Sequence, residues 1–167
     1  MLFKRYKAPQ GMLLLGVSGN RLILCDWIVN DRIVKTLRRI SRFVPKERDD
    51  EADILDMAEK QLDEYFTGRR QEFDLPLQAY GTEFQKKVWK SLSSISFGDV
   101  VSYKGVAERV GQPEAVRAVA NAIGANPLSI LIPCHRVIGS DGKTGGYAGG
   151  KDAKMKLLRH EDPTRSF

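Results

Sequence analysis

Apolar residues near the N-terminus gather in three short stretches, residues 2–7 (LFKRYK), 12–18 (MLLLGVS) and 21–29 (RLILCDWIV). The segments APQG and SGN between them carry the Gly, Pro and Asn residues that favour tight turns. Short apolar runs joined by such turns are typical of neighbouring strands. The pattern predicts an antiparallel meander.

Two segments with helical periodicity follow. In residues 31–43, Ile33, Leu37 and Ile40 recur on one face and basic residues lie on the other, which we interpret as a solvated face. Residues 49–68 begin with acidic residues and end in glycine, as expected for a helix whose dipole favours negative charge at its N-terminus. The predicted buried stripe of this second helix is Ile54, Leu55, Ala58, Leu62, Tyr65 and Phe66.

The segment 69–81 (RRQEFDLPLQAYG) contains Pro76 and Gly81 and is typical of a connection. We therefore expect two domains, an α/β domain over residues 1–78 and a mainly helical domain over residues 79–167. Cys25 lies in an apolar strand without a histidine or basic neighbour, and we interpret it as a small core residue.

The second half begins with two helical patterns that carry their own start signals. Thr82 and Gln85 have the spacing of a capping box. Ser102 is the predicted N-cap of the next helix, and Gly111 is its predicted end. The apolar stripe expected on the first of these helices is Phe84, Val88, Trp89, Leu92 and Ile95.

A third helix is predicted in residues 112–127, with Pro113 in its first turn and Gly124 near its exit. Together with the helix before it, this segment forms a helix-turn-helix pattern, in which it is the candidate recognition helix. Arg117 is its only cation. Two interpretations stay open: a helix packed tightly against its neighbours, or a slim helix that enters a DNA groove with Arg117 reaching into the base stack. Its small residues are Ala115, Ala118, Ala120, Ala122, Gly124 and Ala125.

Length and composition are those of a globular protein. The 167 residues can bury a sizeable core, and 42% hydrophobic with 29% charged residues argues against a disordered or membrane-spanning chain. The first residues lack the apolar region and cleavage site of a signal peptide. We therefore expect an intracellular protein in which Cys25 and Cys134 are free thiols.

The formal net charge of +6 is unevenly distributed. Residues 1–78 contain 14 Lys and Arg against 13 Asp and Glu, whereas residues 79–167 contain 13 against 8. A basic domain is attracted to phosphate backbones, although a modest positive balance is also common in proteins that do not bind nucleic acid.

The strongest candidate for chemistry is Cys134, in the stretch ILIPCHRVIG (130–139). A cysteine thiol has an ordinary pKa of about 8.5 and needs a base or a positive field to become a nucleophile. His135 is adjacent, a bridging water can carry the proton, and Glu161, late in an amphipathic helix, can fix the imidazole tautomer. The alternative is a buried cysteine beside an incidental histidine.

Other chemistries lack their ingredients. Two histidines and two cysteines provide no metal-ligand set at the usual spacings. Residues 140–150 (SDGKTGGYAGG) are glycine-rich but lack the ending of a phosphate loop and the spacing of a dinucleotide fingerprint. We expect a flexible loop whose backbone approaches a ligand closely, with Tyr147 as a wall.

Six segments together resemble the O6-alkylguanine-DNA alkyltransferases. They are TEFQKKVWKSL, VSYKGVAERVG, AVRAVANAIGANP, NPLSILIPCHRVIG, GYAGG and LLRHE. The resemblance covers residues 80–162 in order and spacing, and residues 1–79 only in general plan. It implies a small N-terminal α/β domain with a ribonuclease-H-like sheet, followed by a mainly α domain with a winged-helix-like helix-turn-helix.

The resemblance also implies a reaction and its catalytic residues. Cys134 would take the alkyl group from O6 of a flipped-out guanine, while a water, His135 and Glu161 form the proton relay. Asn126 would brace the active-site turn, and Tyr103 would donate a hydrogen bond to the purine. The thioether product offers no activated carbonyl for water to attack, so we expect each molecule to react once.

The family's mode of binding implies how double-stranded DNA with an alkylated guanine is held. The narrow helix would lie in the minor groove, and Arg117 would fill the gap left by the flipped nucleotide. Backbone groups at Val137 and Ala148 would hold the base edge. The residues expected to bind the base are Val137, Tyr147, Ala148 and Ile123, and those expected to contact DNA are Arg117, Ala118, Ala120, Asn121 and Arg136.

Some positions depart from the family pattern. Ala148 stands where some members have serine, and Ser129 stands where some have a second proline, which leaves open the acceptance of bulky benzyl-type groups. The N-terminal zinc ligands of some relatives are missing, so we expect no metal and no cofactor. We further expect a monomer without a membrane partner, in the cytoplasm or, in a eukaryote, in the nucleus.

Two other classes of function remain to be weighed. A cysteine hydrolase would use the same Cys134, His135 and Glu161 but would turn over repeatedly. A catalytically silent DNA-binding module would use the helix-turn-helix alone, and the presence of Cys134 argues against it, because relatives that only bind alkylated DNA have another residue there. Activity on O4-alkylthymine and cooperativity on DNA are not decided by the sequence.

Overall fold

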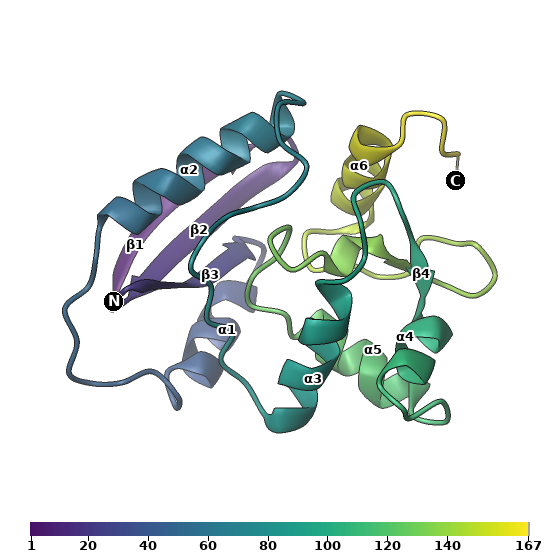
Figure 1. Cartoon of the computed structure of the whole chain (residues 1–167), viewed down its shortest axis with the longest axis horizontal. Coiled ribbons are helices and arrows are strands. Elements are labelled where there is room, and N and C mark those ends of the chain that lie inside the picture. The colour runs from purple at the N-terminus through teal and green to yellow at the C-terminus, as the bar shows by residue number, and fades with distance from the viewer. Residues whose placement is uncertain (167) are drawn as a thin grey trace.

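The computed structural model describes residues 1–166. Its first half contains a three-stranded antiparallel sheet in the order β1 (Leu2–Ala8), β2 (Gly11–Ser18) and β3 (Arg21–Trp27), so the predicted meander is confirmed. Helix α2 (Asp53–Phe66) covers this sheet, and α1 (Arg32–Ile40) lies beside β3 (Figure 1).

The two N-terminal helices bury the apolar stripes that the sequence predicts. On α1, Ile33, Leu37 and Ile40 pack against Ile23 and Leu24 of β3 and form a small second core. On α2, the predicted stripe is buried except for one residue: Phe66 is half-buried and stacks on the ring of Tyr6.

Two of the predicted helix starts in the second half are confirmed. Before α3 (Glu83–Leu92), Thr82 Oγ1 accepts a hydrogen bond from the backbone N–H of Gln85 at 3.1 Å, and Gln85 Oε1 accepts one from the N–H of Thr82 at 3.0 Å. This reciprocal pair is a complete capping box. Before α4 (Tyr103–Arg109), Ser102 Oγ accepts from the N–H of Gly105 at 2.9 Å.

The predicted start of the third helix is wrong by one turn. Helix α5 runs over Val116–Gly124, and Pro113 lies in the turn that precedes it. The N–H of Ala115 bonds to the carbonyl of Gln112 and closes this turn, and Ala115 itself has a ψ angle of 36°, outside the helical region. Proline suits this turn as well as it suits a first helical turn, because its ring fixes φ near −65° and both turns accommodate that angle.

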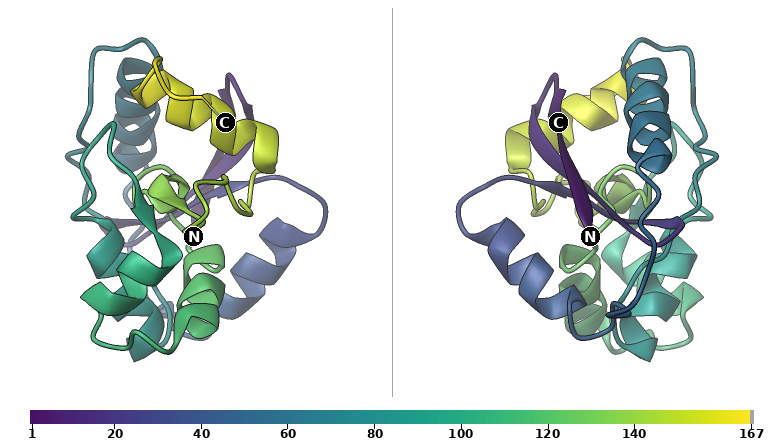
Figure 2. Two further views of the ribbon diagram at one scale, coloured as in Figure 1. Left: turned by 90° about the vertical axis from the view of Figure 1, so that its right-hand side faces the viewer. Right: turned by 90° about the vertical axis from the view of Figure 1, so that its left-hand side faces the viewer.

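The remaining elements surround Cys134. A short 3-10 turn, η1 (Cys134–Arg136), continues into β5 (Val137–Ile138), which pairs in parallel with β4 (Val101–Ser102). Helix α6 (Lys151–Glu161) then returns toward the N-terminal half, where its last residues, His160 and Glu161, contact Tyr65 near the end of α2 (Figures 1 and 2). Within residues 1–166, none of the helices has the length and apolar character needed to cross a membrane.

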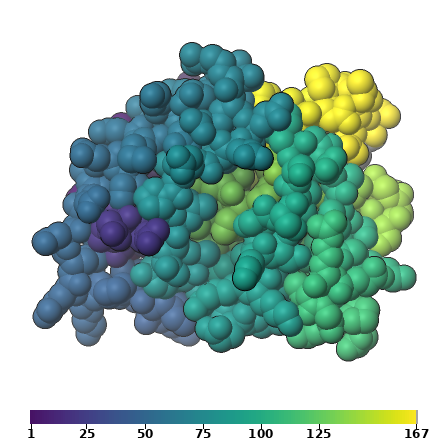
Figure 3. Space-filling model, in the orientation of Figure 1, coloured from purple at the N-terminus to yellow at the C-terminus, as the bar shows by residue number. Residues whose placement is uncertain are grey.

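The free edge of β3 joins the two halves through backbone hydrogen bonds. Leu22 donates to the carbonyl of Pro76, still within the first half, at 2.8 Å, and Cys25 donates across to that of Pro127 in the second half at 2.9 Å. The N–H of Ser129 donates in turn to the carbonyl of Cys25 at 2.7 Å. The chain leading to Cys134 is therefore docked on the N-terminal sheet, and the two halves form one continuous body (Figure 3).

Candidate active site

The turn that precedes Cys134 is held by a buried amide. The Nδ2 of Asn126 donates to the carbonyl of Ile132 at 2.8 Å, and its Oδ1 accepts from the N–H of Leu128 at 3.0 Å. Between these bonds, Ile130 has a φ of 73°. A β-branched residue in the left-handed region is strained and persists only where its surroundings fix it. The amide of Asn126 is thus placed to hold a strained turn in shape.

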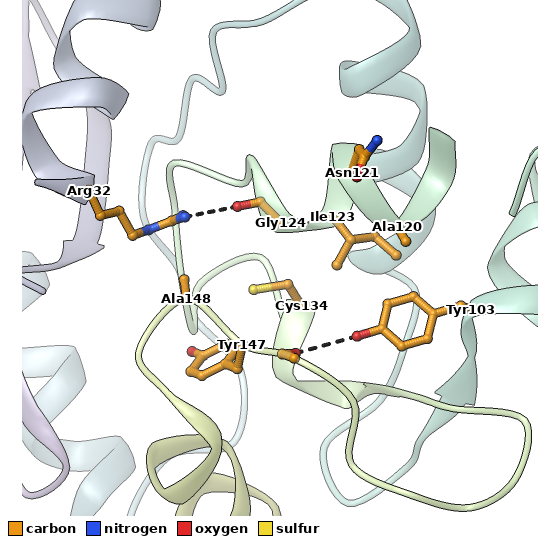
Figure 4. Close-up of a pocket in the computed structure, with 10 residues that line it drawn as sticks. Arg32, Tyr103, Ala120, Asn121, Ile123, Gly124, Cys134, Tyr147 and Ala148 are labelled. Carbon is orange, nitrogen blue, oxygen red and sulfur yellow. Dashed lines mark hydrogen bonds between the residues drawn. The ribbon is translucent and has the colours of Figure 1, made fainter. Parts of the chain in front are cut away.

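Cys134 lies among the residues that line a cavity of about 470 Å³ (Figure 4). One wall comes from α5, and the facing wall comes from the loop before α6. Mostly apolar cavities of this size are typical of sites for small organic groups. Of the residues predicted to act here, those that line it are Tyr103, Ala120, Asn121, Ile123, Cys134, Tyr147 and Ala148.

The thiol of Cys134 is neutral in this environment. Burial raises the pKa of the thiol, and a hydrogen bond with Asn126 and the charge on Arg32 offset this effect only in part. A base is therefore needed before Cys134 can act as a nucleophile.

His135, the residue that follows Cys134, forms a buried pair with Glu161. The Nε2 of His135 lies 2.8 Å from Oε2 of Glu161, and the imidazole is fully buried. Burial lowers the pKa of His135, so its neutral form predominates. Because the carboxylate accepts the Nε2 proton, Nδ1 carries the lone pair. That Nδ1 is buried and has no hydrogen-bond partner among residues 1–166.

Glu161 is ionised and receives several donors. Burial alone would raise its pKa, but hydrogen bonds from His135 and Arg136 hold the pKa well below the ordinary range. The Nε of Arg136 donates to Oε1 at 2.8 Å, and a terminal guanidinium nitrogen donates to Oε2 at 3.0 Å. This fork fixes the plane of the carboxylate.

The structure places Arg136 where a contact with DNA is not available. Its side chain is buried, and its remaining terminal nitrogen donates to the carbonyl of Ile95 at 2.6 Å. The expectation of a DNA contact is therefore corrected: the guanidinium points inward to Glu161 because that carboxylate needs a buried counter-ion.

Lys154 is a residue that sequence reasoning missed. It is fully buried, and its Nζ donates to the carbonyls of Val137 at 2.6 Å and Gly146 at 3.1 Å, with the hydroxyl of Tyr103 at 3.5 Å. Burial lowers its pKa to about 8. In the sequence it is one of several lysines on a polar-rich helix, and no local signal separates it from the exposed ones. The carbonyl of Val137, which was predicted to hold the base edge, thus already accepts a hydrogen bond from Lys154.

Tyr103 lines the cavity with its hydroxyl. It donates weakly to the carbonyl of Gly146 at 3.4 Å, and burial raises its pKa, so it remains a donor at neutral pH. The backbone of Gly145, at a φ of 71°, passes so close that a Cβ there would lie 2.9 Å from this hydroxyl. The loop therefore needs glycine at this point.

Tyr147 forms a wall of the cavity that is fixed from the N-terminal half. Its hydroxyl accepts from Nε1 of Trp27 at 3.0 Å, and the two rings meet edge-on with centroids 6.0 Å apart. A Cβ on Gly149 would lie 2.8 Å from the Trp27 ring, so the close approach of this loop depends on glycine. Ser129, by contrast, is fully buried beneath the turn and does not line the cavity.

The basic face predicted for α1 is only partly solvated, which corrects our interpretation. Arg32 pairs with the buried Asp26 at 3.0 Å and donates to the carbonyls of Gly124 and Asn126. Arg39 donates to the carbonyl of Ala125. These carbonyls end α5, where unpaired acceptors and the helix dipole attract cations.

The outer face of α5 carries the residues predicted to meet DNA. Arg117, Ala118 and Asn121 are exposed and Ala120 is half-buried, whereas Val119, Ala122 and Ile123 are buried inward. The helix therefore presents one cation and several small side chains to solvent.

The chain matches two family models over almost its whole length. Residues 1–79 match the ribonuclease-like domain of the 6-O-methylguanine DNA methyltransferases, and residues 83–163 match their DNA-binding domain. The chain belongs to the 6-O-methylguanine DNA methyltransferase family. The resemblance and the predicted order of an α/β domain followed by a mainly helical DNA-binding domain are both confirmed.

Individual relatives agree with this family. The methylated-DNA–protein-cysteine methyltransferase of Methanosarcina barkeri is 41% identical over 162 residues, which span 97% of this chain and 98% of the relative. The crystal structure of the Mycobacterium tuberculosis O6-methylguanine methyltransferase has a TM-score of 0.80 at 35% identity, covering 98% of this chain and 94% of that one. The structure of M. tuberculosis OGT in complex with DNA has the same TM-score and identity, covering 96% and 92%.

In the part of the chain that the structure describes, no group of three or more His, Cys, Asp or Glu side chains lies close enough to hold a metal ion.

Proposed function

We propose that this member of the 6-O-methylguanine DNA methyltransferase family transfers an alkyl group from O6 of guanine in DNA to Sγ of Cys134, once per molecule. The observation that carries the proposal is the position of Cys134: its side chain lines a cavity of about 470 Å³, and the next residue, His135, pairs with Glu161 at 2.8 Å. The division into domains of residues 1–78 and 79–167 is part of this proposal.

The proton of the thiol leaves toward His135. The lone pair on the buried Nδ1 is the acceptor, and a water between Sγ and Nδ1 carries the proton. Glu161 stabilises the imidazolium that forms. The thiolate then attacks the alkyl carbon, the S–C bond forms, and the C–O6 bond breaks with its electron pair going to the purine.

The departing purine needs a donor for its new negative charge. Tyr103 is suited to this role because both of its hydrogen bonds are long, at 3.4 and 3.5 Å, so its hydroxyl can turn toward a bound base. Backbone groups at Ala148 complete the base-binding wall with Tyr147 and Ile123. The carbonyl of Val137 shares its lone pairs between Lys154 and the base.

DNA meets the exposed face of α5. A damaged base lies inside the duplex stack, so the nucleotide must swing out before Cys134 can reach it. The small side chains of Ala118 and Ala120 allow α5 to enter the minor groove with Asn121 at the backbone, and Arg117 fills the vacated position. The protein acts as a monomer, in the cytoplasm or in a eukaryotic nucleus.

The test is an intact-mass measurement after incubation with a duplex oligonucleotide containing O6-methylguanine. We expect one added methyl group per molecule, located on Cys134 and absent in Cys134→Ser. The matched control is Cys25→Ala, which removes the other, fully buried thiol and should still accept one methyl group.

Two results would contradict the proposal. One is an unmodified thiol after long incubation with the damaged duplex. The other is repeated turnover on an ester or amide without a stable mass increase, which would identify a cysteine hydrolase.

A further inference from the structure

A tyrosine from the N-terminal half reaches the carboxylate of the relay. Tyr65 lies near the end of α2, and its hydroxyl donates to Oε2 of Glu161 at 2.6 Å. Both side chains are buried, although the residues are 96 positions apart in the sequence. The sequence analysis predicted Tyr65 only as part of an apolar stripe. The mechanism proposed above does not use its hydroxyl.

The hydroxyl of Tyr65 is not needed to hold Glu161 in place. Arg136 already grips both carboxylate oxygens through its fork, and the N–H of Gly98 adds a weak contact to Oε1 at 3.4 Å. What Tyr65 changes is the charge on Oε2, which is the same oxygen that faces Nε2 of His135. A donor on that oxygen reduces the negative potential that the imidazole feels.

We propose that the Tyr65 hydroxyl weakens His135 as a base and so keeps more of Cys134 in its protonated form at rest. This inference rests on the proposed relay. Keeping Cys134 protonated is useful because each molecule reacts only once. An electrophile or oxidant that consumed the thiolate at rest would inactivate the molecule before it met DNA.

The other ionisable groups around this cluster stay the same when only the hydroxyl is removed. His135 also faces Arg136 and Lys154, and Tyr65 contacts the ring of His160, whose Nε2 lies 2.8 Å from the Tyr65 carbonyl. Tyr147 and Cys134 complete the set from the cavity side. Burial and Glu161 raise the pKa of Tyr65, so it remains a neutral donor throughout the pH range of the test.

The test is the titration of Cys134 in Tyr65→Phe. The ring and its contacts are retained, and only the donor is lost. With more negative charge on Oε2, the imidazolium is favoured and the thiolate forms more readily. We expect the apparent pKa of the thiol, followed by thiolate absorbance from pH 5 to 10 against Cys134→Ser, to fall by about half a unit, which is about threefold more thiolate below that pKa.

A matched control separates this effect from a general loss of packing. Tyr6→Phe removes a hydroxyl that donates to Asp63 Oδ1 at the same 2.6 Å, from the sheet to the same helix but away from the cavity. Its thiol should titrate as in the wild type. If Tyr65→Phe fails to fold, 3-fluorotyrosine at position 65 gives a second measurement: its more acidic hydroxyl is a stronger donor, so the apparent pKa of Cys134 should rise.

The outcomes distinguish this inference from the proposed function. A wild-type protein that accepts no methyl group would overturn both. A wild type that accepts methyl while Tyr65→Phe leaves the apparent pKa of the thiol unchanged, or raises it, would overturn the role of Tyr65 alone.

Discussion

The two sides of Cys134 are built in opposite ways. On the side of His135, Glu161 accepts hydrogen bonds of 2.6 to 3.0 Å from the buried side chains of Tyr65, His135 and Arg136. In front of it, the cavity is lined mainly by small or apolar groups, and the hydroxyl of Tyr103 makes only long hydrogen bonds.

This difference shows how stability and function are divided in the site. A buried charged cluster must be complete, because removing one partner leaves another charge unpaired in a medium of low polarity. A group that binds the ligand, such as the Tyr103 hydroxyl, cannot be committed to short internal hydrogen bonds, since it has to be free for the ligand. Changes around Glu161 should therefore affect both folding and reaction, whereas changes on the outer face of α5 should affect the handling of DNA alone.

The largest effect is expected from Glu161→Gln. The buried guanidinium of Arg136 loses its counter-ion, so urea denaturation should show a loss of about 3 kcal/mol or more. His135 also loses the anion that stabilises its charged form, and the single-turnover rate of methyl transfer should fall by about a hundredfold or more.

Glu83→Gln provides the control for this change. Glu83 is an exposed carboxylate paired with Lys86, and its loss should alter stability by less than about 0.5 kcal/mol. A Glu161→Gln protein that transfers methyl at the wild-type rate would remove the carboxylate from the relay.

A smaller effect with a defined pH window is expected from Lys154→Met. The pKa of Lys154 is lowered from 10.5 to about 8 on folding, so between these values the unfolded chain binds a proton that the folded protein does not. The unfolding free energy of the wild type is therefore highest above pH 10.5, and this gain is lost as the pH falls from 10.5 through 8. The difference in unfolding free energy between wild type and variant should change by about 2 kcal/mol from pH 8 to pH 10, in favour of the wild type at high pH.

Urea denaturation at a series of pH values checks this prediction. Lys156→Met, on the exposed side of the same helix, is the control and should show no such trend. A difference that is flat with pH would mean that the buried amine keeps its ordinary proton affinity.

The smallest effect on the folded protein is expected from Arg117→Ala. The side chain is exposed, so stability should change by less than about 0.5 kcal/mol. Repair within duplex DNA should slow by about tenfold, because extrusion of the nucleotide is no longer supported, while reaction with a free O6-alkylguanine base should keep its rate.

Arg5→Ala removes the same charge from β1, away from α5, and should leave both rates unchanged. If Arg117→Ala slows the free base and the duplex equally, the arginine does not act in nucleotide extrusion, and the contrast between the two sides of Cys134 is weaker than we infer.

The local features of the fold could be predicted because their signals are local. Thr82 with Gln85, and Ser102 with Gly105, satisfy helix N–H groups only three residues away, so their spacing is sufficient. Pro113 was misplaced because the same residue suits a turn and a first helical turn. Cys134, His135 and Glu161 were singled out from their residue types before the resemblance to the family, and the structure places His135 Nε2 2.8 Å from Glu161.

The residues around the site that were missed or misread share one property: their partners are distant in sequence. Arg136 was expected to contact DNA from the family's mode of binding, yet it pairs with the buried Glu161 instead. Lys154 looked like its exposed neighbours, and Arg32 like part of a solvated face. Their carbonyl partners come from β5 and the loop before α6 for Lys154, and from the C-terminal end of α5 for Arg32.

The sequence by itself determined the three N-terminal strands, the starts of α3 and α4, and the thiol with its neighbouring imidazole, since each can be read within a few residues. Only the tertiary structure decided which polar side chains became buried partners of Glu161, and that α2 supplies Tyr65 to a site in the other half. The physical reason is that the proton affinity of a buried group depends on every charge and dipole within a few ångströms, and those neighbours are selected by packing.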